Sequence, residues 1–569
     1  ALIHLYTTSG QEAQALAELQ VLGRIQKQII RRGALHLSEH ELAAYTASFS
    51  DYFHSHFTIL EGIEPPPGPA TEAAYDDVLF YKGFLLANTS RVRRLVIEDP
   101  TLAEKQEQLS QVQTRLSAEY AKPPAAREGL DALEAEANRL EKVLVTSVAR
   151  YGAAYQQVAW QAVQQALQAG EAALEFVRFA ALEDDLRGDF QYAALLILPG
   201  NGSPLFIPLF SEEALQQVLN PVSGQRIERI NQLYAWSGAQ SPSLFQLIWQ
   251  PLAAQLEGIS TIYFSPDGIL HRLNLNAIAT DAQQVLGEQF RLVRLSSTRQ
   301  LAFEVGTTAS DHTAALFGGI EYDPEQESRN QGPGAARKRG TGREGSGLRL
   351  RGEDWSYLDW TKTEIETIGL LTEAAGLATT SFTGHAATEE VFKAFGGSKG
   401  GPQLLHLATH GYFFPTPDQE QERNAFEASQ HPMIRSGLIL ANGNYAWKNG
   451  EPIAAGVDDG ILTAYEIAQL DLHQTELVTL SACETGLGEI KDIEGVFGLQ
   501  RAFKLAGVRY IVMSLWQIPD FQTQEFMTAF YFNYLDQGMP IPTAFRRAQL
   551  ELRKRYPDPF LWAGFVLME

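Results

Sequence analysis

The sequence predicts a mixed α/β fold that is preceded by an all-α region. Apolar residues recur at three-and-four spacing through residues 1–172, as they do in amphipathic helices. From about residue 173, short apolar runs bounded by Gly, Pro and Asp replace that pattern, which is typical of strands. From 354 onward, near-continuous apolar strands alternate with helices. This alternation favours a largely parallel sheet with helices on both faces.

Composition limits the class of protein. The 569 residues (62.9 kDa) exceed one hydrophobic core, so we expect two to four domains. The net charge of -23 argues against direct binding of nucleic acid or an acidic membrane surface. A single cysteine excludes an internal disulfide and fits a reducing, cytoplasmic location. No long apolar run or signal peptide is visible, and the missing initiator Met leads us to expect a piece of a longer protein.

The first expected unit, residues 1–172, is helical. The stretches "DPTLAEKQEQLSQVQTRLSAEYA" and "GLDALEAEANRLEKVLVTSVARY" both carry helical periodicity, and Pro123 and Pro124 interrupt it. We therefore expect a helical hairpin with its turn near 122–128. A further amphipathic helix should end at Gly170. The region serves either as a scaffold or as a binding surface for a partner protein.

Two units are expected between this region and residue 354. Residues 173–322 contain the strand-like runs "AALEFVRFA", "YAALLILPG", "PLFIPLF" and "STIYF", and we expect an α/β unit there. Residues 323–353 are rich in Gly, Arg and Lys, which predicts a disordered basic linker. That linker is either a solvated loop or a cleavage or docking segment, and its basic residues are Arg337, Lys338, Arg339 and Arg343.

The last unit, residues 354–569, carries the residues with the most chemistry. Strand "LLHLATH" ends at His410, and strand "LVTLSAC" ends at Cys483. Because ligands meet the carboxyl ends of the strands in such sheets, we expect these two side chains to face each other at one edge. An imidazole beside the thiol would raise its thiolate fraction, and Gly411 and Cys483 would offer backbone N–H groups to an oxyanion. The alternative is a small, buried and inert cysteine.

His406 and His410 also invite a metal interpretation because they lie four residues apart. This spacing suits a zinc pair on a helix, yet the stretch alternates like a strand and no ligand cluster accompanies it. We therefore expect no metal and no cofactor, and we interpret His406 as a strand histidine with satisfied hydrogen bonds.

Several blocks of the sequence resemble one family in order and spacing. "HLATHGYF" at 406–413 and "LSACETGLG" at 480–488 are similar to the two signature blocks of the CHAT domain, a caspase-like cysteine peptidase module related to separases. "DDGILTAYEIAQLDL", "GVFGLQRAFKLAG", "SLWQIPD" and "FLWAGFVLM" resemble its later blocks. The match is dense from about 403 and looser back to about 173, and the helical start resembles the segment that follows tetratricopeptide (TPR) repeats in longer members.

The resemblance implies a caspase-haemoglobinase-like fold and a cysteine endopeptidase that cleaves a protein substrate. By block matching, His410 is the general base and acid, and Cys483 is the nucleophile. The upstream unit, 173–322, resembles a non-catalytic pseudo-caspase half, and 354–569 resembles the catalytic half. The dyad suffices in this clan, so no catalytic carboxylate is needed.

The resemblance also implies substrate contacts. Ser514 and Leu515 would pair with an extended peptide by strand addition, and Trp516 would wall a side-chain pocket. Asp520 matches the separase residue that holds the substrate arginine, which implies a basic residue at P1, although Pro519 departs from that pattern. Asp520 is alternatively an N-cap of a helix beginning near Gln522. Ser481 is grouped with these substrate-binding residues.

Regulation and partners follow from the same resemblance. Family members with TPR regions work in bacterial defence, some docked on RNA-guided CRISPR effectors and others cutting gasdermins. This implies an activating protein or ribonucleoprotein partner that binds through the N-terminal helical region. A peptidase with basic P1 preference would also find Arg337, Lys338 and Arg339 in its own linker as a self-cleavage site. The alternatives are a catalytically silent CHAT scaffold that acts by protein–protein interaction, and another reaction of an activated thiol.

Overall fold

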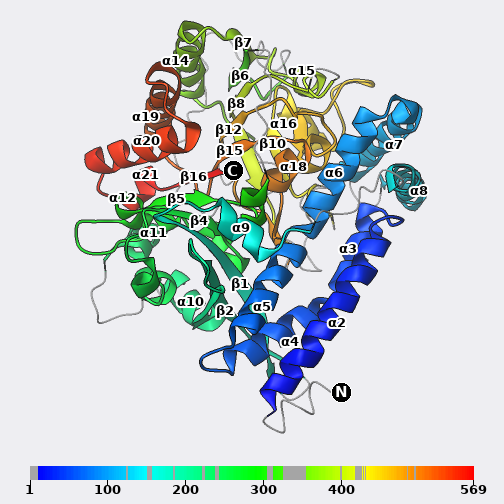
Figure 1. The fold of residues 1–569 in the computed structure, drawn as a ribbon. Coiled ribbons are helices and arrows are strands. Elements are labelled where there is room, and N and C mark those ends of the chain that lie inside the picture. Colours follow the sequence, from blue (N-terminus) through cyan, green and yellow to red (C-terminus); the bar gives the residue numbers. More distant parts are fainter. Residues whose placement is uncertain are drawn as a thin grey trace.

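The computed structural model describes residues 11–122, 126–149, 157–183, 186–220, 225–236, 243–303, 312–324, 354–397, 400–416, 426, 429, 431–482, 485–491 and 495–569. An eleven-stranded sheet runs through the described part of the chain in the order β3-β2-β1-β4-β5-β16-β15-β12-β8-β6-β7 (Figure 1). Its strands are β1 (Glu171–Glu183), β2 (Leu186–Ile197), β3 (Leu205–Ser211), β4 (Thr261–Ser265), β5 (Arg291–Arg294), β6 (Thr313–Ile320), β7 (Ala378–Gly384), β8 (Leu404–Ala408), β12 (Leu477–Ser481), β15 (Tyr510–Ser514) and β16 (Phe565–Met568).

The predicted largely parallel sheet is confirmed. Strands β1, β4 and β5 are parallel to one another, as are β15, β12, β8, β6 and β7. Only β2 and β3 at one edge, and β16 against β15, run antiparallel to their neighbours. The near-continuous apolar composition of β8 and β12 fits their burial on both faces.

The two halves of the molecule meet in this sheet where β5 pairs with β16. Strand β5, from the upstream half, pairs with β16, the last strand of the chain, through the register Met568↔Arg294. Strand β6 lies within the expected 173–322 unit, yet its two neighbours in the sheet, β7 and β8, come from residues after 354. The change from one half to the other therefore falls before β6 in this sheet.

Helices cover both faces of the sheet. Helices α14, α19 and α20 stack on one side of the C-terminal half, and α16 and α18 lie on the other (Figure 1). The helices after residue 172 are α10 (Glu212–Leu219), α11 (Arg226–Tyr234), α12 (Leu286–Gln289), α14 (Thr361–Ala374), α15 (Glu389–Ala394), α16 (Gly443–Asn449), α17 (Ala464–Ile467), α18 (Leu499–Leu505), α19 (Asp520–Tyr531), α20 (Ile541–Arg555) and α21 (Pro559–Trp562). Short 3₁₀ turns at Gly268–Arg272 and Leu275–Ala277 follow β4.

The N-terminal region is helical, as its periodicity predicts. Helices α7 and α8 lie side by side on either side of the expected turn, and α4 packs on β1. The Phe57 ring lies 5.8 Å from that of Phe179 on β1, so the aromatic face of α4 covers the sheet. The helices are α2 (Glu12–Gly33), α3 (Glu39–Ala47), α4 (Ser50–Glu61), α5 (Gly68–Tyr81), α6 (Phe84–Glu98), α7 (Ala103–Tyr120), α8 (Leu130–Ala149) and α9 (Trp160–Ala166).

The strand that was expected to end at His410 ends earlier. Strand β8 stops at Ala408, and His410 begins β9 (His410–Phe413), which belongs to a second, three-stranded sheet with β10 (Ser436–Ile439) and β11 (Ile461–Thr463). The Thr409 hydroxyl donates a hydrogen bond to the carbonyl oxygen of Ile439, and His410 pairs with that same residue. The chain leaves the main sheet at Thr409 because the Thr409 side chain and the following residues bind β10.

Candidate active site

The carboxyl ends of β8 and β12 lie next to each other, as predicted. The two strands are parallel neighbours, with Ala408 in register with Ser481. His410 therefore follows β8 at the edge where the chain leaves β12 toward the predicted nucleophile. Cys483 itself lies outside the described residues, which end at Ala482 and resume at Thr485.

The His410 side chain is held by specific contacts. Its Nε2 lies 2.7 Å from the carbonyl oxygen of Ser356, which can only accept a hydrogen bond, so the proton of this ring sits on Nε2. The ring packs between Tyr322 and Trp355, each with ring centroids 5.1 Å from it. These contacts fix the ring orientation and leave Nδ1 as the basic nitrogen of the neutral imidazole.

A pocket of about 430 Å³, counting the space at its mouth, opens beside this edge. Residues from the ends of β8, β12 and β15 line it together with the starts of α14 and α19. The lining residues are Leu358, Trp360, Thr361, Glu364, Thr409, Ser481, Ala482, Ser514, Trp516, Ile518, Asp520, Thr523 and Phe565. Thr409 and Ala482 directly precede His410 and Cys483 in the sequence, so the pocket adjoins the predicted dyad.

Asp520 lines this pocket as the first residue of α19. Pro519 is the N-cap residue and no side chain caps the helix, so the alternative interpretation of Asp520 as the N-cap is wrong. Burial, followed by the nearby Glu364 and Asp359 carboxylates, raises the pKa of Asp520. Within the described ranges no lysine or arginine pairs with it, and the pocket presents a half-buried carboxylate without a cationic partner.

Sequence reasoning missed Glu364, which lines the same pocket. Its Oε1 lies 2.9 Å from Nε2 of His406, and Nδ1 of His406 lies 3.2 Å from the hydroxyl of Tyr531. His406 is thus a buried strand histidine with both ring nitrogens satisfied, as predicted, and the described residues contain no metal-binding cluster. The signal for Glu364 was available, because it shares the buried face of its helix with Ile368.

The backbone of Ser514 and Leu515, which was expected to pair with a substrate peptide, forms hydrogen bonds within the protein instead. The backbone N–H of Ser514 donates to Oγ1 of Thr485 (3.0 Å), its carbonyl accepts from Gly486 (2.7 Å), and Leu515 N–H donates to Gly564 (2.8 Å). Three of the four backbone polar groups of these residues are therefore already bonded, because β16 lies on one side and the 485–486 turn on the other, and they are not available for strand addition.

The other predicted contact residues do reach the pocket. Trp516 is buried, and its indole Nε1 donates to the Phe560 carbonyl at 2.9 Å, which holds the ring as a wall. The Ser481 hydroxyl oxygen is buried at the pocket and makes no hydrogen bond with any described residue. Gly411 lies in β9 opposite Leu438. Its role as an oxyanion donor stays a prediction.

Arg435 is a second residue that sequence reasoning missed. Its fully buried guanidinium donates to the Phe414 carbonyl at 3.1 Å and forms an ion pair with Glu489. Phe414 directly follows β9, and Glu489 begins β13 (Glu489–Lys491), which forms a hairpin with β14 (Gly495–Phe497) after the cysteine turn. Arg435 therefore ties the histidine segment to the segment that follows Cys483. A charged residue inside the apolar run "MIRSGLILA" was the available signal.

Two further expectations concern other parts of the chain. The residues of the predicted self-cleavage site, Arg337, Lys338 and Arg339, lie outside the described residues. Among the helices that the structure describes, none combines the length and the apolar character needed to cross a bilayer.

Comparisons with known proteins identify the C-terminal part. The family profile of the CHAT domain matches residues 239–569, which is more than half of the chain. Tetratricopeptide repeat protein 28 of Homo sapiens is 32% identical over 110 residues, or 19% of this chain and 4% of its own length, and the Mus musculus protein is 31% identical over the same shares. The chain thus matches only a small part of these curated relatives.

Two kinds of solved structure are also similar. The Arg-specific cysteine proteinase gingipain R is 11% identical, with 62% of this chain and 68% of that chain covered and a TM-score of 0.34; the pro- and mature domains from Porphyromonas gingivalis also match. The Saccharomyces cerevisiae separase–securin complex is 9% identical, with 98% of this chain and 40% of that chain covered and a TM-score of 0.40.

Proposed function

The chain belongs to the CHAT domain family, and we propose that it is a cysteine endopeptidase in which His410 and Cys483 form the catalytic dyad. The proposal is supported by three features of one sheet edge. β8 and β12 are parallel neighbours that lead into the two residues, His410 is held with Nδ1 as its basic nitrogen, and a side-chain pocket adjoins both strand ends.

The dyad would act by covalent catalysis. His410 Nδ1 takes the proton of the Cys483 thiol, and the thiolate attacks the scissile carbonyl carbon. The backbone N–H groups of Gly411 and Cys483 stabilise the oxyanion of the tetrahedral intermediate. His410 then returns the proton to the leaving amine, and water, deprotonated by His410, releases the acyl group from Cys483.

The single observation that carries the substrate class is the Asp520 carboxylate. It lines the pocket beside the dyad, no described cation neutralises it, and its charged neighbours are acidic. A guanidinium or ammonium group entering the pocket would form a charge-assisted hydrogen bond there. We therefore assign a preference for Arg or Lys at P1, with Trp516 as a wall and the Ser481 hydroxyl as a polar contact.

A peptide library varied at P1 tests this function. The wild-type chain should hydrolyse peptides with Arg or Lys at P1, and the Cys483→Ala variant should hydrolyse none. Cleavage with no preference at P1 would remove the role of Asp520 but leave the peptidase, whereas equal turnover by both proteins would refute the dyad.

Regulation through the N-terminal helical region is part of the proposal. Arg501 on α18 donates to Glu39 at the start of α3 over 2.9 Å, and α18 follows β14 of the hairpin after the cysteine turn. A partner that moves α3 would thereby act on the segment next to Cys483. Two further proposals, a role in bacterial defence and self-cleavage at the basic linker, rest on the family resemblance alone. Incubation of the active protein tests self-cleavage, since the linker should then be cut.

One observation favours a second function, that of a CHAT scaffold without catalysis. Helix α2 exposes three aliphatic side chains on one face, Val21 (43%), Ile25 (49%) and Ile29 (36%). They recur every four residues and so form one stripe on the helix. An apolar stripe of this kind suits protein–protein contact. Covalent labelling of Cys483 that depends on His410 separates the two functions.

A further inference from the structure

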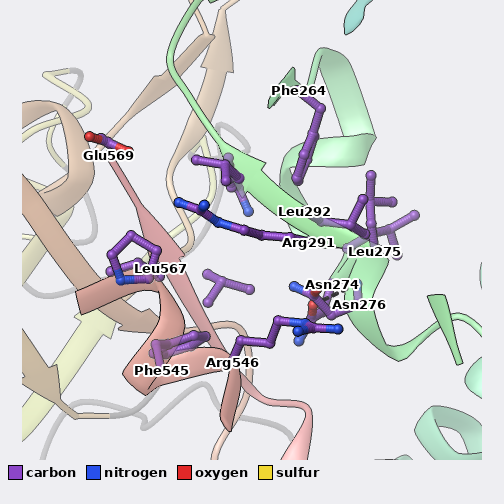
Figure 2. A pocket seen from close by; sticks show the side chains of 15 residues that line it. Phe264, Asn274, Leu275, Asn276, Arg291, Leu292, Phe545, Arg546, Leu567 and Glu569 are labelled. Atoms are coloured by element: carbon purple, nitrogen blue, oxygen red, sulfur yellow. Dashed lines mark hydrogen bonds between the residues drawn. The ribbon is translucent and has the colours of Figure 1, made fainter. Parts of the chain in front are cut away.

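A second pocket lies at the junction between the two halves of the sheet, and none of its lining residues lines the pocket beside the predicted dyad. Its volume is about 560 Å³ when the open solvent at its mouth is included, and we call it the seam pocket. Figure 2 shows the side chains of Arg291 from β5 and Arg546 from α20 at this pocket, extending in different directions, and Leu567 of β16 also lines it. The lining residues are Phe264, Leu273, Asn274, Leu275, Asn276, Arg291, Leu292, Val293, Arg294, Pro542, Phe545, Arg546, Val566, Leu567 and Glu569.

Three arginines line the seam pocket, and one of them is deeply buried. Arg294 is only 5% exposed, its Nη2 donates to the His271 carbonyl at 2.9 Å, and its Nε has no hydrogen-bond partner among the described residues. The Nε of Arg291 is likewise buried without a partner in the described part of the chain. Arg546 uses two of its donors on the Gly287 and Glu288 carbonyls, at 2.8 and 3.2 Å.

The positive charge of the three arginines is not balanced. None of them forms an ion pair with a carboxylate within the described ranges. Two acids beside the pocket form ion pairs with other arginines. Glu288, which also favours the charge of Arg546, pairs with Arg553 at 2.5 Å, and the lining residue Glu569 pairs with Arg509 at 3.5 Å. Burial lowers the pKa of Arg294 to about 10, as expected for a buried cation that no anion stabilises. Such a charge is costly to bury alone, whereas a bound anion would offset it.

We propose that the seam pocket binds a small phosphate-bearing molecule. Guanidinium forks match phosphate oxygens, and the guanidinium side chains of Arg291, Arg294 and Arg546 line the same pocket. A phosphate dianion neutralises two of the three charges, whereas a single carboxylate neutralises only one. The apolar side chains of Phe264, Leu275 and Phe545 on the pocket wall suit a ligand with an apolar body beside its phosphate.

The position of the pocket gives this ligand a structural effect. Arg291 and Arg294 belong to β5 of the upstream half, and Arg546 belongs to α20 of the catalytic half. The ligand would bridge two halves whose sheet contact is the single register β5–β16. Strand β16 lines both pockets, since Phe565 faces the pocket beside the dyad and Val566 and Leu567 face the seam pocket. Binding therefore stabilises the strand that the two pockets share.

Thermal unfolding of the whole chain with inorganic pyrophosphate or inorganic phosphate tests the proposal. We expect a saturable rise in Tm, about 2 °C or more at saturation, relative to sodium chloride and sodium acetate at equal ionic strength. Arg291→Gln should abolish the phosphate-dependent rise, because Arg291 lines the pocket and has no carboxylate partner among the described residues. Arg547→Gln is the matched control, since this neighbour of Arg546 is 52% exposed and pairs with Glu551 at 2.9 Å outside the pocket; it should keep the rise.

Two results would overturn the proposal. Pyrophosphate and phosphate that shift Tm no more than chloride and acetate at equal ionic strength would show that the pocket does not bind phosphate. An equal, phosphate-dependent shift in wild type, Arg291→Gln and Arg294→Gln would show that phosphate acts elsewhere on the protein. Arg291→Gln keeps the test decisive if Arg294→Gln fails to fold, because Arg291 is partly exposed.

Discussion

Replacing Asp520 with asparagine should remove the preference for a basic P1 residue while leaving the peptidase intact. Asp520 and asparagine have the same shape, so the pocket keeps its volume and loses only the charge. Hydrogen bonds to charged groups contribute about 1.5–3 kcal/mol, which corresponds to a change of roughly 10- to 150-fold in kcat/KM. We expect this loss for a peptide with Arg at P1 and almost none for its neutral isostere, citrulline.

The assay compares two fluorogenic peptides that differ only at P1, Arg or citrulline, on the wild type and on Asp520→Asn. Wild type should favour Arg, and the variant should cleave both at the citrulline rate. Because the pKa of Asp520 is raised, the Arg preference should also fade at a higher pH than for an ordinary aspartate as the solution is acidified. An unchanged Arg preference in Asp520→Asn would refute the assignment of Asp520 as the P1 contact.

The same substitution has a defined effect on stability. A carboxyl whose pKa is raised by folding contributes its greatest stability below its unfolded pKa and loses it as the pH rises through the folded value. The ionised form of Asp520 is therefore unfavourable in the folded state. Asp520→Asn should have a free energy of unfolding equal to or above that of wild type, and a large decrease would mean that the carboxylate has a partner that this account omits.

Three other substitutions test separate parts of the structure. Phe57→Ala should lower the free energy of unfolding by about 3–5 kcal/mol in urea titration, because the ring is buried against the sheet; the exposed Phe521→Ala is the control. Burial and Glu466 raise the pKa of Asp459 to about 7, so Tm should fall between pH 4 and 7 less steeply in Asp459→Asn than in wild type, and identical slopes would contradict the shift. Arg435→Met should lower the free energy of unfolding by about 3–5 kcal/mol in urea titration, because it removes the ion pair with Glu489 and the buried hydrogen bond to the Phe414 carbonyl; an unchanged stability would contradict this role of Arg435.

The sequence predicts those features of the site that depend on local patterns. The apolar runs that end in "LLHLATH" and "LVTLSAC" mark buried parallel strands, and their neighbourhood follows from the rule that such strands share one sheet edge. The interpretation of His406 as a satisfied histidine follows in the same way, since its alternating context favours a strand.

Features that depend on distant partners could not be predicted. The end of β8 at Ala408 is set by Ile439, thirty residues past Thr409, which no local pattern near the histidine indicates. The bonded backbone of Ser514 depends on Thr485 and on β16 at the end of the chain. The union of both halves in one sheet rests on β5 and β16, which lie far apart in the sequence.

The most direct test of the dyad is covalent labelling by an electrophilic peptide with Arg at P1. Cys483 is the only cysteine, so every thiol adduct reports on it alone. We expect rapid labelling of the wild type and loss of that labelling in His410→Ala, with both proteins folded by circular dichroism. Equal, slow labelling of the two proteins would mean that His410 does not activate Cys483 in this chain by itself, and would contradict an assembled catalytic dyad in this structure.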